Sequence, residues 1–157
     1  MRWLLLGIAL AACQRADDAK PAPAAPPPHK LELVAAPVTK EVAPLVAREL
    51  ARAKADHRRM LVYVGASWCE PCNHFHDAAA AGKLDDAFPA LRLLVFDAER
   101  DHDGLVKAGY DSELIPLFMV PADDGKASGS HIEGSIKGDG AVAQITPRLR
   151  DLLGSAP

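Results

Sequence analysis

The sequence predicts an α/β domain whose central mixed sheet has about four strands and is flanked by helices. Apolar β-rich runs alternate with amphipathic helical patterns, and a tight-turn dipeptide, Asp124-Gly125, separates the last two strands. Strands separated by helices imply parallel pairing through right-handed crossovers. The final hairpin adds an antiparallel pair, so the sheet is expected to be mixed.

The predicted elements follow the order α-β-α-β-α-β-β-α. In the first helix, Thr39 is the candidate cap, and Pro44 is tolerated only in the first turn. In the last helix, Pro147 predicts a kink or a late start. Apolar spacing and glycine stops predict helices at 42–53, 71–81, 101–108 and 139–153, and strands at 61–64, 91–96, 117–120 and 131–133.

Composition and charge limit the class of protein. The chain has 157 residues, of which 49% are hydrophobic and 25% charged, and this excludes wholesale disorder and a multi-pass membrane protein. A net charge of −3 provides no broad basic surface to attract nucleic acid, so no nucleic-acid partner is expected. The length leaves room for one domain and an accessory segment.

Residues 1–12 are predicted to be a signal peptide. Arg2 precedes a short apolar run that meets small residues and falls short of the ~20 apolar residues needed to span a bilayer. Leu10-Ala11-Ala12-Cys13 resembles the lipobox of bacterial lipoproteins, which implies cleavage before Cys13 and lipidation of Cys13. An ordinary secretory signal is the alternative. Lipidation, however, also accounts for the odd count of three cysteines.

Residues 13–37 are predicted to be a lipid-anchored Pro/Ala-rich linker, followed by the folded domain at 38–157. Prolines clustered between residues 21 and 28 favour extended polyproline II, about 3.1 Å per residue. A proline-rich ligand for a recognition domain is the alternative. We expect a protein of the bacterial cell envelope that faces the periplasm. The outer membrane is favoured because Gln14 follows Cys13.

The stretch Trp68-Cys69-Glu70-Pro71-Cys72 lies at a predicted junction between a strand and a helix. Two cysteines at this spacing can close a small disulfide ring. The helix N-terminus favours a thiolate at Cys69, and the thiolate is the attacking species in disulfide exchange. We predict that Cys69 is the exposed nucleophile. Cys72, one turn into the helix, is expected to be more buried and to resolve the mixed disulfide.

This stretch, with its strand and helix, resembles the thioredoxin superfamily over about residues 38–153. The segment from Ala108 to Pro116 resembles the approach to that family's cis-proline, so the resemblance implies a cis Ile115–Pro116 bond. It also implies that Ile115 and Pro116 position the substrate. Trp68 is predicted to shield the disulfide and contact the substrate, and simple packing is the alternative. The Cys-Glu-Pro-Cys pair resembles those of membrane-tethered extracytoplasmic thiol-disulfide reductases.

The resemblance implies a thioredoxin-like thiol-disulfide oxidoreductase that exchanges its Cys69–Cys72 dithiol or disulfide with protein substrates, favoured as a reductase. No bound cofactor is needed. A membrane partner is expected to donate or accept electrons, and the protein is expected to be a monomer held to the membrane by its lipid anchor.

Two positions depart from the pattern of cytoplasmic thioredoxins. Tyr63 stands where those proteins have a buried aspartate on the strand before the site, and Leu117 replaces the usual threonine after the proline. Glu70, Glu113 or a water molecule are candidates to replace the aspartate in proton transfer.

Two other functions use the same residues. A purely structural Cys69–Cys72 disulfide would add little stability, because the entropic effect grows with loop length. A copper or zinc site could use Cys69, Cys72, His74 and His76. The two histidines lie about 200° apart around a helix, so they cannot easily face one metal, and no metal site is predicted. A metal-handling or redox-inactive interaction module remains the alternative function.

Overall fold

A computed structural model describes residues 30–155 of the chain, which contain five strands and four helices. The elements in chain order are β1 (Glu32–Ala35), α1 (Val42–Ala55), β2 (Arg59–Gly65), α2 (Glu70–Ala80), β3 (Leu91–Asp97), α3 (His102–Ala108), β4 (Leu117–Pro121), β5 (Ala127–Glu133) and α4 (Ala141–Ser155).

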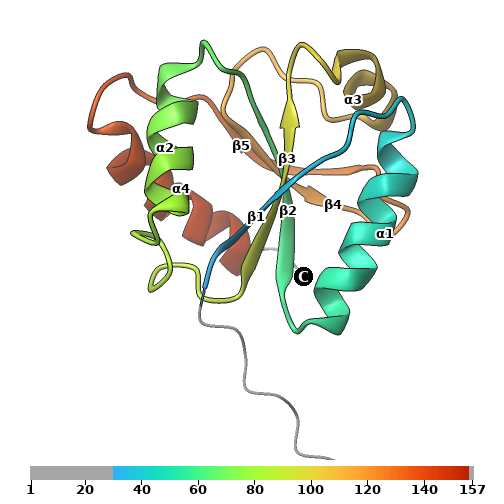
Figure 1. Cartoon of the computed structure of the whole chain (residues 1–157), viewed down its shortest axis with the longest axis horizontal. Coiled ribbons are helices and arrows are strands. Elements are labelled where there is room, and N and C mark those ends of the chain that lie inside the picture. The colour runs from blue at the N-terminus through green and yellow to red at the C-terminus, as the bar shows by residue number, and fades with distance from the viewer. Residues whose placement is uncertain (1–29, 156–157) are drawn as a thin grey trace, which may run out of the picture.

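The five strands form one mixed sheet in the order β1-β3-β2-β4-β5 (Figure 1). Strands β1, β3 and β2 are parallel, whereas β4 runs antiparallel to β2 and to β5. The predicted mixed α/β sheet is confirmed, with the hairpin at Gly125, whose φ is 80°. The carboxyl ends of β2 and β3 and the start of β4 therefore share one end of the sheet.

The strand missing from the sequence prediction is β1. Leu31 is buried, and Val34 pairs with Leu94 of β3, so the folded domain begins before residue 38. The linker predicted for residues 13–37 consequently ends earlier than expected. The reason is that β1 is stabilised by pairing with β3, about sixty residues later in the chain, and its own four residues show no clear strand pattern.

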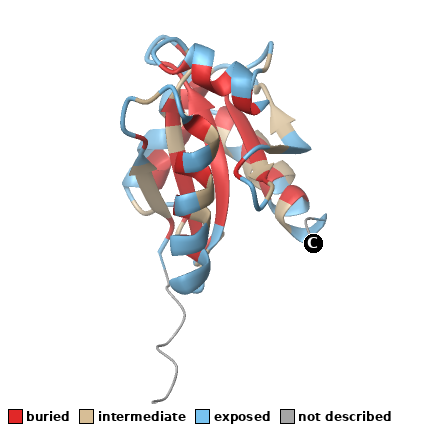
Figure 2. Cartoon of the chain, turned by 90° about the vertical axis from the view of Figure 1, so that its right-hand side faces the viewer, coloured by how far each residue is buried: buried red, intermediate tan, exposed pale blue. Residues whose placement is uncertain are grey.

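Two hydrophobic clusters cover the two faces of the sheet. Helices α1 and α3 pack on one face, and α2 and α4 on the other, so the strands form the buried layer between them (Figure 2). Strand β2 shows the alternation: Val62 and Val64 belong to the first cluster, while Leu61 and Tyr63 belong to the second. Both faces are covered, and this explains why β2 is a continuous apolar run.

The helices match their predicted ranges closely, with two local differences. Glu41, not Thr39, occupies the cap position of α1, and the Thr39 hydroxyl instead accepts the N–H of Glu41 at 3.0 Å. Helix α4 begins at Ala141 and continues through Pro147 to Ser155.

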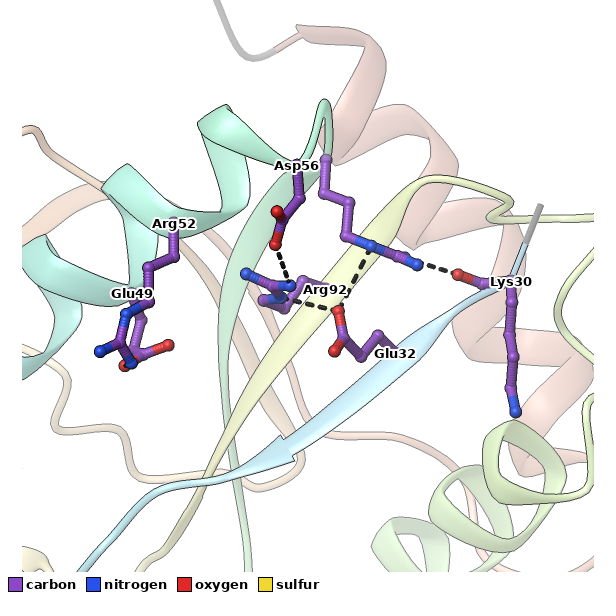
Figure 3. A network of polar contacts seen from close by, with 7 residues as sticks. Lys30, Glu32, Glu49, Arg52, Asp56 and Arg92 are labelled. Atoms are coloured by element: carbon purple, nitrogen blue, oxygen red, sulfur yellow. Dashed lines mark hydrogen bonds and ion pairs between the residues drawn. The ribbon is translucent and has the colours of Figure 1, made fainter. Parts of the chain in front are cut away.

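An ion-pair network joins the amino ends of β1 and β3 to the end of α1 (Figure 3). The buried guanidinium of Arg92 donates to the carboxylates of Glu32 and Asp56, both at 2.7 Å. Arg58 lies 3.3 Å from the same Glu32 carboxylate and donates to the Lys30 carbonyl at 2.6 Å. The network fixes the point where the chain enters the fold, at the end of the sheet opposite the carboxyl end of β2.

The predicted signal peptide, Cys13 and the first part of the linker lie outside the described residues. In residues 30–155, the helices are all too short or too polar to cross a membrane.

Candidate active site

The two cysteines of the motif form a disulfide at the N-terminus of α2. Cys69 is the N-cap residue of this helix, and its sulfur accepts the backbone N–H of Cys72 at 3.3 Å. Pro71 occupies the first turn, where a missing N–H costs nothing. A thiolate at Cys69 would therefore accept a hydrogen bond and lie at the positive end of the helix dipole. Both effects stabilise negative charge.

Cys72 is buried as predicted, whereas the prediction that Cys69 is exposed is wrong for the disulfide form. The exposed fraction is 4% for Cys69 and 3% for Cys72. Both pack in a small cluster with Ala66, and Ala98 and Ile115 lie against it. Ala98 and Ile115 come from distant loops, so the motif alone could not reveal that they pack against the two cysteines.

The cis Ile115–Pro116 bond implied by the resemblance is present in the structure. The Pro116 carbonyl accepts the N–H of Gly134 at 2.9 Å, so the loops before β4 and after β5 are joined beside the disulfide. Within residues 30–155, the backbone N–H and C=O of Ile115 form no hydrogen bond. They are available to pair with another chain.

Exposed apolar side chains lie on the loops next to the disulfide. Trp68, directly before Cys69, is 65% exposed, and Leu114, directly before Ile115, is also exposed. Gly134 approaches Leu114 so closely that an added Cβ would lie 3.2 Å from its side chain. The rim of the site can therefore meet an apolar surface on another protein.

Solved structures similar to this chain include thioredoxins. A poplar wild-type thioredoxin h is 24% identical, and the match covers 81% of this chain and 99% of that chain with a TM-score of 0.51. A thioredoxin from Trichomonas vaginalis is 17% identical, and the match covers 79% and 97% of the two chains with a TM-score of 0.50. The domain has the thioredoxin fold. No protein-family model matches the sequence, and no curated protein is similar to it at the sequence level.

Tyr63 lies directly behind the disulfide of this thioredoxin-fold domain. Its ring is stacked on Phe118 with the centroids 4.7 Å apart, and its hydroxyl donates to the Cys72 carbonyl at 3.0 Å. Burial raises the pKa of Tyr63 well above its ordinary value. The hydroxyl therefore stays protonated and holds the first turn of α2, and it cannot take a proton from Cys72.

The two glutamates named as replacements for the family's aspartate lie elsewhere. Glu70 accepts the N–H of Gly138 at 3.1 Å, so its carboxylate links the start of α2 to the loop before α4. Glu113 is exposed. Neither side chain lines the crevice that opens beside Cys72.

A crevice of about 190 Å³ opens beside the disulfide, between α2 and the carboxyl ends of β1, β2 and β3. Its polar lining residues are Tyr63, Cys72, Asn73, His76, Asp97 and Arg100. A larger groove of about 660 Å³ lies at the opposite end of the sheet, around Arg59 and Leu153, and is remote from the cysteines. The reactive site is therefore identified by its two cysteines and not by the volume of the cavity.

His74 and His76 point to different surroundings. His74 lies near Glu70, with 3.8 Å between Nε2 and the carboxylate, while His76 lines the crevice. In the part of the chain that the structure describes, no group of three or more potential ligands is arranged to hold a metal ion. Both motif sulfurs are engaged in the disulfide.

The crevice is the part of the site that sequence reasoning did not find. Its walls come from four separate segments of the chain, and the spacing of His76 four residues after Cys72 was the one available indication. From the sequence, His76 was predicted to be a solvated or packed helix residue, with metal binding as the alternative.

Proposed function

We propose that this protein is a thiol-disulfide oxidoreductase that exchanges disulfides with protein substrates. The observation that carries the proposal is the Cys69–Cys72 disulfide at the N-terminus of α2, next to the unpaired backbone of Ile115. A helix N-terminus stabilises the thiolate that attacks, and a free backbone edge can hold an extended substrate segment in register.

The proposed reaction has two steps. In the reduced protein the Cys69 thiolate attacks a substrate disulfide, forms a mixed disulfide and releases one substrate thiol. Cys72 then attacks the Cys69 sulfur, forms the Cys69–Cys72 disulfide and releases the second substrate thiol. Two electrons pass from the dithiol to the substrate, which is thereby reduced. We favour this reductase direction, in which a membrane partner supplies the electrons that regenerate the dithiol.

The proposal is tested by the reduction of insulin with dithiothreitol as electron source. The full chain is expected to accelerate the appearance of insulin turbidity strongly, because its thiolate attacks disulfides faster than a free thiol of ordinary pKa. The matched control is the double variant Cys69→Ser, Cys72→Ser, which should equal the uncatalysed rate. Equal rates for the native chain and this variant would refute the proposal.

The site of action is proposed to be the cell envelope, with Cys13 lipidated. The lipobox-like Leu10-Ala11-Ala12-Cys13 supports this, and Lys30 lies at the end of the sheet opposite the disulfide. A tether attached there would leave the disulfide facing away from the membrane. The orientation leaves the Ile115 edge accessible to substrates.

Cys13→Ser is expected to move the protein from the membrane fraction to the soluble fraction of bacteria that express it. Stable anchoring takes more than one acyl chain, and the variant would carry none. The fractions are compared by immunoblotting. Cys69→Ser, which keeps Cys13, serves as the control and should stay with the membranes. Retention of Cys13→Ser in the membrane fraction would contradict lipid anchoring.

A further inference from the structure

The second step of the proposed reaction requires Cys72 to lose a proton. The thiolate is the attacking form in disulfide exchange, and a buried thiol cannot pass its proton straight to bulk water. Cys72 is 3% exposed. It also lines the 190 Å³ crevice, which is roomy enough for several waters, since one water needs roughly 15 Å³ of such space. The crevice therefore offers a route for the proton.

Most polar groups that line the crevice cannot accept this proton. Arg100 keeps its charge at all accessible pH values, and the Asn73 amide is not a base. Tyr63 is neutral and already donates its hydroxyl proton to the Cys72 carbonyl. Two groups remain in the lining, the carboxylate of Asp97 and the imidazole of His76.

The Asp97 carboxylate already has a structural role. Its Oδ1 accepts the N–H of Glu99 at 3.0 Å and the N–H of Arg100 at 2.9 Å, which forms the turn after β3. The paired Arg100 and Asp101 side chains lie in the same turn. The Asp97 carboxylate is therefore already used as an acceptor of the backbone hydrogen bonds that hold this turn.

His76 is better placed. It follows Cys72 by four residues on α2, so both side chains lie on the same face of the helix. Its ring is half exposed, and its Nδ1 lies 3.8 Å from the Asp77 carboxylate, beyond hydrogen-bond distance. Histidine is the side chain whose ordinary titration lies between pH 5 and 8, which suits proton transfer near neutrality.

We propose that His76 accepts the proton of Cys72 through water in the crevice during the resolving step. The inference rests on the proposed function. The Cys72 thiol gives its proton to water, and that water passes a proton to the neutral imidazole. The resulting thiolate attacks the Cys69 sulfur, the bond between Cys69 and the substrate breaks, and the departing substrate thiolate takes a proton from solvent or from the imidazolium.

The charged and titratable groups that face His76 come from three elements. Asp77 lies on its own helix, Asp97 at the end of β3 with Arg100 just after it, and the protonated Tyr63 on β2. The positive Arg100 and the two carboxylates partly offset one another around the imidazole. His76 therefore lies among charges of both signs.

The test follows the two steps separately with dithiobis(nitrobenzoate), an aromatic disulfide whose thiolate product is coloured. The full chain carries Cys13→Ser, so that only Cys69 and Cys72 react. The first release of the coloured thiolate, whose rate depends on the reagent concentration, reports attack by Cys69 on the reagent. The second release, whose rate does not depend on the reagent concentration, reports attack by Cys72 on the mixed disulfide. Adding Cys72→Ser should abolish the second release alone.

His76→Gln is expected to leave the first release within about twofold of the native rate. The second release should slow by at least about tenfold near pH 7, since a positioned base typically contributes 10²-fold or more. The difference should disappear in alkaline solution, where hydroxide deprotonates the thiol. His74→Gln is the matched control. This residue lies two positions away on α2, outside the crevice lining, and its profile should match the native one.

Three results would overturn the inference. One is a second release in His76→Gln that matches the native rate across the pH range. Another is an equal slowing in His74→Gln. The third is a slow second release in Asp97→Asn while His76→Gln stays normal. Absence of the first release would instead refute the proposed function itself, so the two failures are distinguishable.

Discussion

Cys72→Ser is expected to accumulate a covalent mixed disulfide with an insulin chain, and Cys69→Ser is expected to accumulate none. Cys69 is the N-cap of α2 and its sulfur receives the Cys72 N–H, so its thiolate is the better stabilised of the two. With the resolving thiol gone, the mixed disulfide has no internal attacker and persists. Turnover should fall by at least about 100-fold in both variants, because each lacks one thiolate.

The trapped species is measured by non-reducing electrophoresis after acid quenching and is assigned to Cys69 by mass spectrometry. The double variant Cys69→Ser, Cys72→Ser controls for non-covalent retention. Equal trapping by the two single variants would mean that the helix N-terminus does not distinguish the sulfurs. The experiment is decisive because the disulfide form buries both sulfurs almost equally.

Local patterns were sufficient to predict the central strands and all four helices. The apolar run of β2 and the glycine at position 109, which has a φ of 83°, are properties of the chain itself. The disulfide was predicted for the same reason, because both cysteines lie on one turn of chain. These features depend on residues close in sequence, and so periodicity and spacing reveal them.

Features that depend on distant residues were not predicted. Strand β1 needs its partner β3, and the Glu32 carboxylate needs Arg92. Ala98 and Ile115 pack against the cluster that contains Cys69, and the crevice forms only when α2 meets the carboxyl ends of β1, β2 and β3. The sequence contains these residues, but pairing and packing decide which of them share a surface.

Gly125→Ala is expected to cost the largest amount of stability among single substitutions at the turns. The residue has a φ of 80°, and its loop packs on the backbone of α1. An added Cβ would overlap the Ala43 carbonyl oxygen and lie 2.7 Å from the Ala47 nitrogen. Backbone atoms of a helix cannot move aside cheaply. We therefore expect a loss of about 4 kcal/mol in the free energy of unfolding, from strain and overpacking combined.

The matched control is Gly129→Ala, which separates backbone strain from steric overlap. Gly129 has a φ of 88°, but an added Cβ there would meet nothing within 4 Å. Gly129→Ala should therefore lower the free energy of unfolding by only about 1 kcal/mol, the cost of placing an alanine in the left-handed conformation. Urea unfolding followed by circular dichroism gives both free energies. Failure of Gly125→Ala to fold while Gly129→Ala folds would agree with the prediction. Equal losses in the two variants would show that the hairpin moves away from α1 at little cost, so this contact would not hold the β4–β5 end of the sheet in place.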